Sequence, residues 1–189
     1  MLSEDKKIKT RAQLKEYLDV ELEPYQLHGR QYIAYIFQIS ERAILRKHTI
    51  LLRKTEYYLN SGHKLIGELY HARLAKMQNK YAFRIPLNCC GKGFRIVHVS
   101  PVGVNDHSTV GENCRINICA YLLGDDDGMG ATIGDNVIIG SGAKIVGGVT
   151  LADNITVGAG AVVTKSFDEP GVTLAGVPAK IIGRKHHMF

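Results

Sequence analysis

The chain has 189 residues, enough for one compact domain with an extension, and its 45% hydrophobic and 22% charged content is ordinary for a globular protein. No apolar run reaches the roughly 18 residues that a membrane span requires. The first ten residues also lack the apolar stretch of a secretory signal. We therefore expect no membrane span and a cytoplasmic location.

The net charge of +6 comes entirely from the first part of the chain. Residues 1–80 contain 15 Lys and Arg against 9 Asp and Glu, whereas residues 81–189 contain 9 of each. A basic segment suits an anionic substrate, a nucleic acid or a membrane surface. Its acids and bases are interspersed, however, as on an ordinary solvated helix face, and the later region shows no basic–aromatic interleaving. We expect no nucleic-acid partner.

Residues 1–80 predict helices. Thr10 and Gln13 form a capping-box pattern that opens a helix, and Pro24 ends it. The stretch 32–59 contains no Gly or Pro and places apolar residues at helical intervals, which predicts one long helix with a stop at Asn-Ser-Gly, residues 60–62. A third helix is expected over residues 64–79.

The histidines and cysteines outside the later motifs show no pattern of a metal or redox site. Four histidines are scattered through the helical region and are expected on helix surfaces: His28, His48, His63 and His71. The four cysteines have no C-x-x-C spacing and are expected to be free thiols with small apolar roles: Cys89, Cys90, Cys114 and Cys119. We expect no bound metal.

From residue 81 the helical period gives way to a period of six. Aliphatic residues recur without a break at Ile133, Ile139, Ile145, Leu151, Val157 and Val163. Apolar residues also stand four positions after each of these, at Val137, Ala143, Val149, Ile155, Ala161 and Phe167. An earlier set with the same step comprises Val104, Val110, Ile116 and Leu122. A fixed six-residue period is typical of a parallel β-helix, in which stacked coils bury one continuous column.

The register of the repeat changes once. The step from Leu122 to Ile133 is eleven residues rather than twelve, across the glycine-rich and acidic segment 124–130. Asp125, Asp126 and Asp127 do not follow the alternating pattern of a calcium-binding loop. We expect a loop that leaves the coil here, either as a simple surface loop or as a substrate loop of an active site.

The repeat region resembles the serine acetyltransferase branch of the hexapeptide acyltransferases. The similar segments run in order: 84–86 (Arg-Ile-Pro), 91–98 (Gly-Lys-Gly-Phe-Arg-Ile-Val-His), 133–137, 140–145, 157–165 and 175–180 (Ala-Gly-Val-Pro-Ala-Lys). The resemblance implies a mainly β fold, a left-handed parallel β-helix preceded by an α-helical region. We accordingly expect an amino-terminal helical region over residues 1–80 and an acetyltransferase domain with a short tail over residues 81–189.

The same resemblance implies the chemistry. It predicts a homotrimer that holds acetyl-CoA between adjacent subunits, with His98 as the general base that takes a proton from an acceptor hydroxyl. Imidazole suits this role because it titrates near neutral pH and a hydroxyl is a poor nucleophile there. Backbone amides of the coil would steady the developing oxyanion. His107 is a weaker candidate and is expected at a solvent-facing corner.

The resemblance also implies a cofactor groove of small residues: Gly140, Ser141, Gly142, Ala143, Gly158, Ala159, Gly160 and Ala161. Thr164 is also expected to bind the cofactor. Lys165, Lys180, Arg184 and Lys185 are placed to meet the phosphates of CoA, which cationic side chains suit; a basic solvated tail is the alternative for these cations. The segment around Pro178 is expected to carry a cis peptide bond.

Two departures from the serine acetyltransferases decide the acceptor that we predict. Those enzymes pair the histidine with an aspartate where this chain has Phe83, and they carry an Arg-His-Pro segment where it has Met129, Gly130 and Ala131. The chain therefore resembles the acetyltransferases of capsule and exopolysaccharide clusters more closely. We predict O-acetylation of a sugar or polysaccharide precursor, with serine O-acetylation as the alternative.

Two other classes share the coil. A γ-type carbonic anhydrase requires three zinc-binding histidines, whereas only His98 and His107 lie within the repeats. A non-catalytic trimeric scaffold is also open, because fold alone does not establish function. The sequence leaves undecided the acceptor, the group that orients His98, and the role of the amino-terminal helices.

Overall fold

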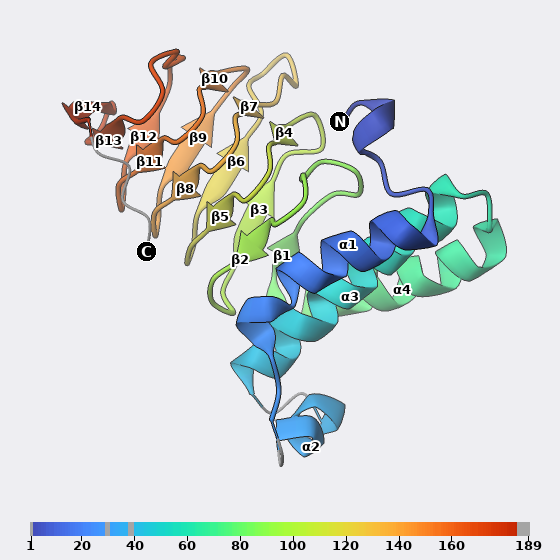
Figure 1. Cartoon of the computed structure of the whole chain (residues 1–189). Helices are drawn as coiled ribbons and strands as arrows, with labels where there is room; N and C mark the ends of the chain where they lie inside the picture. The colour runs from blue at the N-terminus through green and yellow to red at the C-terminus, as the bar shows by residue number, and fades with distance from the viewer. Residues whose placement is uncertain (1, 29–30, 38–39, 185–189) are drawn as a thin grey trace. The chain divides into compact units, whose positions relative to one another are not determined.

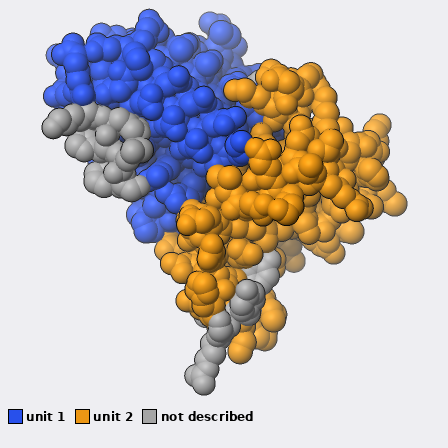
Figure 2. Space-filling model, viewed as in Figure 1, with its two compact units in different colours: residues 1–2, 82–189 blue, residues 3–81 orange. Residues whose placement is uncertain are grey.

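The computed structural model describes residues 2–28, 31–37 and 40–184. The chain divides into two compact units, coloured separately in Figure 2: residues 3–81, and residues 1–2 together with 82–189. The division falls close to the boundary expected at residue 80. That each part is a separate functional domain stays a prediction.

The unit of residues 3–81 is helical (Figure 1). Its elements are η1 (Glu4–Lys6), α1 (Arg11–Glu21), η2 (Glu23–Tyr25), α2 (Gln31–Phe37), α3 (Glu41–Asn60) and α4 (Lys64–Tyr81). The predicted capping box opens α1: the Thr10 hydroxyl accepts from Gln13 N at 3.2 Å, and Gln13 Oε1 accepts from Thr10 N at 3.0 Å. α1 ends at Glu21, and Pro24 lies in the short η2 that follows.

The prediction of one long helix over residues 32–59 is wrong. α2 ends at Phe37 and α3 begins at Glu41; residues 38–39 lie outside the described part of the chain. Ser40 has an extended backbone (φ −106°, ψ 146°), and its hydroxyl accepts from Ala43 N at 3.2 Å. A serine can thus cap a new helix inside a stretch that has no Gly or Pro.

α3 contacts both α1 and α4 and supplies most of the buried side chains of this unit (Figure 1). One of them is His48, whose side chain is 3% exposed, with Nε2 3.3 Å from Nε2 of Gln78 on α4. The prediction that His48 decorates a helix surface is therefore wrong. It occupies the face of α3 that also buries Ile44, Leu45 and Leu51. The other three histidines of this unit are exposed, as expected.

The second unit is a parallel β-helix, as predicted. Its strands are β1 (Phe83–Arg84), β2 (Arg95–Ile96), β3 (Val102–Val104), β4 (Thr109–Val110), β5 (Arg115–Ile116), β6 (Tyr121–Leu123), β7 (Thr132–Ile133), β8 (Ile138–Ile139), β9 (Lys144–Val146), β10 (Thr150–Leu151), β11 (Thr156–Val157), β12 (Val162–Val163), β13 (Thr173–Ala175) and β14 (Lys180–Gly183). They form three sheets: sheet A (β1-β3-β6-β9-β12), sheet B (β4-β7-β10) and sheet C (β2-β5-β8-β11-β13-β14). All pairs are parallel except β13–β14.

The six-residue period corresponds to the interior of this coil. Each of the three central coils contributes one strand to sheet A, one to sheet B and one to sheet C, whereas the first and last coils reach sheet B through the isolated bridges of Cys90 and Phe167. The aliphatic residue of each hexapeptide is at most 2% exposed from Ile133 through Val163. The second apolar set, Val137 through Phe167, is buried at the turns between strands. Stacking therefore gives one continuous core. No described helix is long and apolar enough to cross a bilayer.

Candidate active site

The turns that join sheet C to sheet A stack into one edge of the coil, which we call the C–A edge. It consists of residues 97–101, 117–120, 140–143 and 158–161 in four successive coils. His98 lies in the first of these turns and is exposed, and the predicted groove residues make up the third and fourth turns. The structure thus brings the predicted base and the eight predicted small residues to the same edge.

Backbone hydrogen bonds hold the C–A edge in register. Val97 N donates to Ile116 O at 3.0 Å, Gly142 N to Ile118 O at 2.7 Å, and Gly160 N to Ser141 O at 2.8 Å. Neighbouring coils of such a stack are about 4.8 Å apart. The turn at 140–143 is two coil steps from the turn of His98, with the turn at 117–120 between them, so we estimate their spacing along the edge at about 10 Å.

The glycines of these turns leave bare backbone on the outside of the edge. Gly142 and Gly160 have φ of 71° and 67°, which side chains rarely adopt, and an added Cβ at Gly160 would meet no atom within 4 Å. Gly140 and Gly158 serve packing instead, because a Cβ there would lie 2.6 Å from Val157 O and 3.0 Å from Leu174 O respectively. A slender extended group, such as a pantetheine arm, therefore fits against the third and fourth turns.

The predicted phosphate-binding residues are less closely grouped. Thr164 and Lys165 lie in the turn after β12, on the edge between sheets A and B, where Lys165 Nζ is 5.5 Å from the centre of the Phe167 ring. Lys180 begins β14, next to the cis peptide bond between Val177 and Pro178 that we expected. Arg184 Nε donates to Glu169 Oε1 at 2.7 Å, which raises its pKa. Lys185 lies outside the described residues.

The acidic segment leaves the coil as a loop, as expected, between β6 and β7. Asp125 closes it: Oδ1 accepts from Met129 N at 2.7 Å, and Oδ2 accepts from Gly148 N at 3.4 Å. Gly130 packs against the turn at 105–108, since a Cβ there would lie 2.3 Å from Ser108 N. Asp125 therefore has a structural role, whereas Asp126 and Asp127 are exposed at the tip.

The loop and His98 stand on different edges of the coil. The loop occupies the edge that joins sheet A to sheet B, the A–B edge, which consists of turns 105–108, 124–131, 147–149 and 164–166. His107 is also on this edge and is exposed, as expected of a corner residue, and its backbone N donates to Asn105 Oδ1 at 2.9 Å. Within one chain, His98 therefore has neither the acidic loop nor His107 on its own edge.

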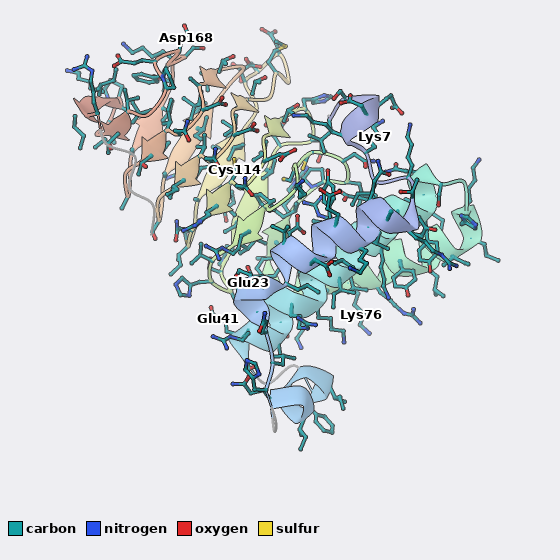
Figure 3. The ribbon with its side chains drawn as sticks, in the orientation of Figure 1. Lys7, Glu23, Glu41, Lys76, Cys114 and Asp168 are labelled. Atoms are coloured by element: carbon teal, nitrogen blue, oxygen red, sulfur yellow. The ribbon has the colours of Figure 1, made fainter. Side chains whose placement is uncertain are left out.

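Three of the four cysteines are buried in the coil, and all four are free, as predicted. Burial raises the pKa of the Cys114 thiol (labelled in Figure 3) to about 12, so this group stays protonated at neutral pH and is no nucleophile. Cys119 differs from the prediction of an apolar role, because it is exposed in the second turn of the C–A edge. Among the residues that the structure describes, no three His, Cys, Asp or Glu side chains are grouped to hold a metal ion.

One hollow of the coil was not predicted from the sequence. It measures about 270 Å³ on the outer face of sheet A and is lined in part by Arg84, Gly103, Tyr121 and Gly124. Gly103 makes the space for it, since a Cβ there would lie 2.8 Å from Cδ1 of Tyr121. The sequence feature that could have indicated this hollow is a glycine at an outward-facing strand position. Because Gly124 also begins the acidic loop, the hollow and the loop adjoin.

Comparison with known proteins agrees with this architecture. Residues 130–165 match the bacterial transferase hexapeptide (six repeats). They comprise the acidic loop's end, the third and fourth turns of the C–A edge, and the strands between them. The transferase hexapeptides thus coincide with the part of the coil where the period of six is unbroken.

Serine acetyltransferases are among the relatives found both by sequence and by structure. A probable serine acetyltransferase 5 of rice (Oryza sativa subsp. japonica) is 45% identical over 105 residues, which are 53% of this chain and 30% of the rice protein. The chain thus matches less than a third of that relative. The serine acetyltransferase of Neisseria gonorrhoeae in complex with serine superposes with a TM-score of 0.62 at 22% identity, covering 92% of this chain and 70% of that one. The soybean enzyme complexed with serine gives 0.63 at 23%, covering 89% and 69%.

These relatives favour the alternative of serine O-acetylation over the sugar acceptor that we predicted, and they give no support to the capsule and exopolysaccharide branch. The departure at Phe83 nevertheless has a structural counterpart. The Phe83 side chain points into the coil at the start of sheet A and is 4% exposed, so this position supplies no carboxylate to the surface.

Proposed function

We propose that this chain is an acetyl-CoA-dependent O-acetyltransferase whose acceptor is L-serine. The observation that carries the proposal is the common edge of His98 and the two glycine-containing turns, 140–143 and 158–161. The 45% identity over 105 residues with a probable serine acetyltransferase supports both the reaction and the acceptor.

In the proposed reaction His98 accepts the proton of the serine hydroxyl while the hydroxyl oxygen attacks the thioester carbonyl. As the carbon–sulfur bond breaks, the protonated imidazole returns that proton to the departing thiolate. Such acid–base catalysis contributes about 10²–10⁴-fold to a rate. His98 is exposed in its turn, so its ring is open to a substrate.

The third and fourth turns would hold the co-substrate. Gly142 and Gly160 leave space against the backbone for the pantetheine arm. A related structure, the serine acetyltransferase of Brucella abortus in complex with coenzyme A, has a TM-score of 0.57 at 23% identity. Lys165 and Lys180 would meet the phosphates.

We further propose that the site forms between two copies of the chain, within a homotrimer. The acidic loop on the A–B edge and His98 on the C–A edge belong to different edges of one coil. A substrate that touches both would therefore draw them from neighbouring copies. Asp126 and Asp127 at the loop tip then become candidate contacts for the serine ammonium group.

A sugar hydroxyl is the competing acceptor. It is favoured by Phe83, which is buried where serine acetyltransferases carry an aspartate, and by the lack of an Arg-His-Pro segment in the loop. Both acceptors use the same base and the same co-substrate. The choice between them therefore depends on direct assay.

The decisive experiment measures thiol release from acetyl-CoA with L-serine in one series and nucleotide sugars in another. We expect turnover with L-serine that falls by about 10²–10⁴-fold in His98→Ala and persists in the matched control His107→Ala. Turnover with sugars alone would overturn the acceptor. Turnover that survives His98→Ala would overturn the base, and failure of every acceptor would favour the non-catalytic scaffold.

A further inference from the structure

The helical unit contains a basic hollow that the acetyl-transfer reaction does not use. α3 and α4 form a half-open space of about 340 Å³, lined by Lys47, Leu51, Arg73, Lys76, Met77 and Lys80. Its apolar lining is buried, with Leu51 7% and Met77 5% exposed. Lys47 is half-buried, and the three cations of α4 are exposed; Figure 3 labels Lys76 among them.

The four cations of this basic hollow have no carboxylate partner among the described residues; Arg73 and Lys80 lie 5.9 and 5.0 Å from the centres of the Tyr70 and Tyr81 rings. Arg53 pairs with Glu21 and Glu56. Arg42 and Arg46 donate to backbone carbonyls. The only carboxylate in the sequence of α4 is Glu68, and it lies 3.5 Å from a ring nitrogen of His71.

The spacing of the cations on α4 is unfavourable for the helix itself. Arg73 and Lys76 are three residues apart and Lys76 and Lys80 are four apart, so the three lie on one helix face. Like charges at these spacings destabilise a helix. A gathering of positive charge around an apolar floor, without compensating acids, is therefore best explained by an anionic ligand that supplies the missing charge.

We propose that the basic hollow binds a nucleoside polyphosphate, at a site separate from the proposed acetyl-CoA groove. Lysine and arginine bind phosphate oxygens through charge-assisted hydrogen bonds, and four cations suit more than one phosphate. The floor of Leu51 and Met77 offers an apolar surface to a base, and methionine adapts readily to flat ligands. The volume of about 340 Å³ is within the range of small-molecule sites, roughly 300–1,000 Å³.

Isothermal titration of the full-length protein with ATP, ADP, AMP and inorganic pyrophosphate tests the proposal. We expect saturable binding of ATP that weakens in the order ATP, ADP, AMP and with rising ionic strength, and weaker binding of pyrophosphate, which has no base. The double variant Lys76→Glu/Lys80→Glu should weaken ATP binding by at least about tenfold. The helical circular dichroism signal confirms that this variant folds.

Lys64→Glu is the matched control, because Lys64 is an exposed lysine of the same helix outside the basic hollow. We expect it to leave the affinity for ATP within about twofold, since exposed charges act weakly beyond a Debye length. An equal loss in Lys64→Glu would overturn the site in favour of a diffuse charge effect. Pyrophosphate binding as tight as that of ATP would overturn the role of the apolar floor.

Two further outcomes would replace the ligand class. Binding of a single-stranded oligonucleotide or of vesicles containing acidic lipid, without binding of ATP at millimolar concentration, would overturn the proposal in favour of a polymer or a membrane surface. Because we assign the phosphates of CoA to Lys165 and Lys180, ATP binding by the variant Lys165→Glu/Lys180→Glu separates this site from the acetyl-CoA groove. Loss of ATP binding in that variant would place the nucleotide on the coil and contradict the proposal.

Discussion

The buried face of α3 combines three charged or titratable side chains that would be costly to bury alone. Arg53 is 0% exposed, lies 2.7 Å from Glu21 and 2.8 Å from Glu56, and stacks over the Tyr17 ring at 5.0 Å. Burial opposes its charge, but the two carboxylates outweigh burial and raise the pKa of Arg53 well above its ordinary value. The guanidinium is therefore a fixed positive charge inside the helical unit.

His48 lies in the field of that charge. Burial, assisted by the charge of Arg53, lowers its pKa from 6.5 to about 3, so the imidazole is neutral in the folded protein. The unfolded chain binds a proton at His48 below pH 6.5, whereas the folded chain does not until about pH 3. Protonation of His48 therefore does not reduce the free energy of unfolding above pH 6.5, and it reduces this free energy progressively as the pH falls from 6.5 toward 3.

We predict that lowering the pH from 7 to 5 reduces the free energy of unfolding by about 2 kcal/mol through His48 alone, because the unfolded chain binds a proton at this residue and the folded chain does not. Urea unfolding followed by helical circular dichroism at both pH values would measure the loss in the wild type and in His48→Gln. The variant should lose about 2 kcal/mol less than the wild type over this interval. His71→Gln, at an exposed position of α4, serves as the control and should behave like the wild type. Identical losses in wild type and His48→Gln would contradict the buried neutral imidazole.

At the scale of the element, a buried core position and an exposed surface position are neighbours in the sequence of a strand. Ile145 is 0% exposed in β9, and Lys144 in the same strand is exposed. We predict that Ile145→Ala costs about 2–5 kcal/mol, because it opens a cavity in a column that cannot close over it. Lys144→Ala should change stability by less than about 0.5 kcal/mol.

Differential scanning calorimetry of the two variants would measure this contrast. Equal losses would mean that the inner column does not carry the stability of the coil. The experiment tests the core itself, since both substitutions shorten a side chain in one strand and leave its backbone pairing with β6 and β12 in place.

The same periodicity explains how far the sequence allowed the elements to be predicted. Every repeat places one aliphatic side chain toward the interior, so many residues independently predict the same coil. The break at Ser40 and the burial of His48 each depend on one residue and its tertiary neighbours. No pattern repeats either of them, and both predictions were wrong for that reason.

At the scale of the whole coil, the candidate site was predictable only in part. The turns at 140–143 and 158–161 are eighteen residues apart, which is three hexapeptides, so they fall on one edge by counting alone. His98 comes to that edge through turns of irregular length, and only the structure shows it. The hollow beside Gly103 and the basic hollow of the helical unit depend on side-chain contacts that no motif marks.

The different edges of His98 and the acidic loop give a prediction about the assembled molecule. We first expect Asp126→Asn/Asp127→Asn to lose activity without losing the fold, because the loop is closed by Asp125 and the tip residues are exposed. An active double variant would contradict the substrate role of the loop. The native mass should be three times the 20.9 kDa of one chain by light scattering.

Co-expression of this loop variant with His98→Ala then tests whether one site draws on two chains. In a ring of three, a site between copies is intact where a loop-variant chain supplies His98 and its neighbour, the His98→Ala chain, supplies the loop. Random mixing makes this true of about a quarter of the sites, so about a quarter of wild-type activity should return. If both groups of a site came from one chain, no mixture would contain an intact site. If the mixed trimers are as inactive as either parent, the loop and His98 of one site come from the same copy. That result would contradict a site formed between copies.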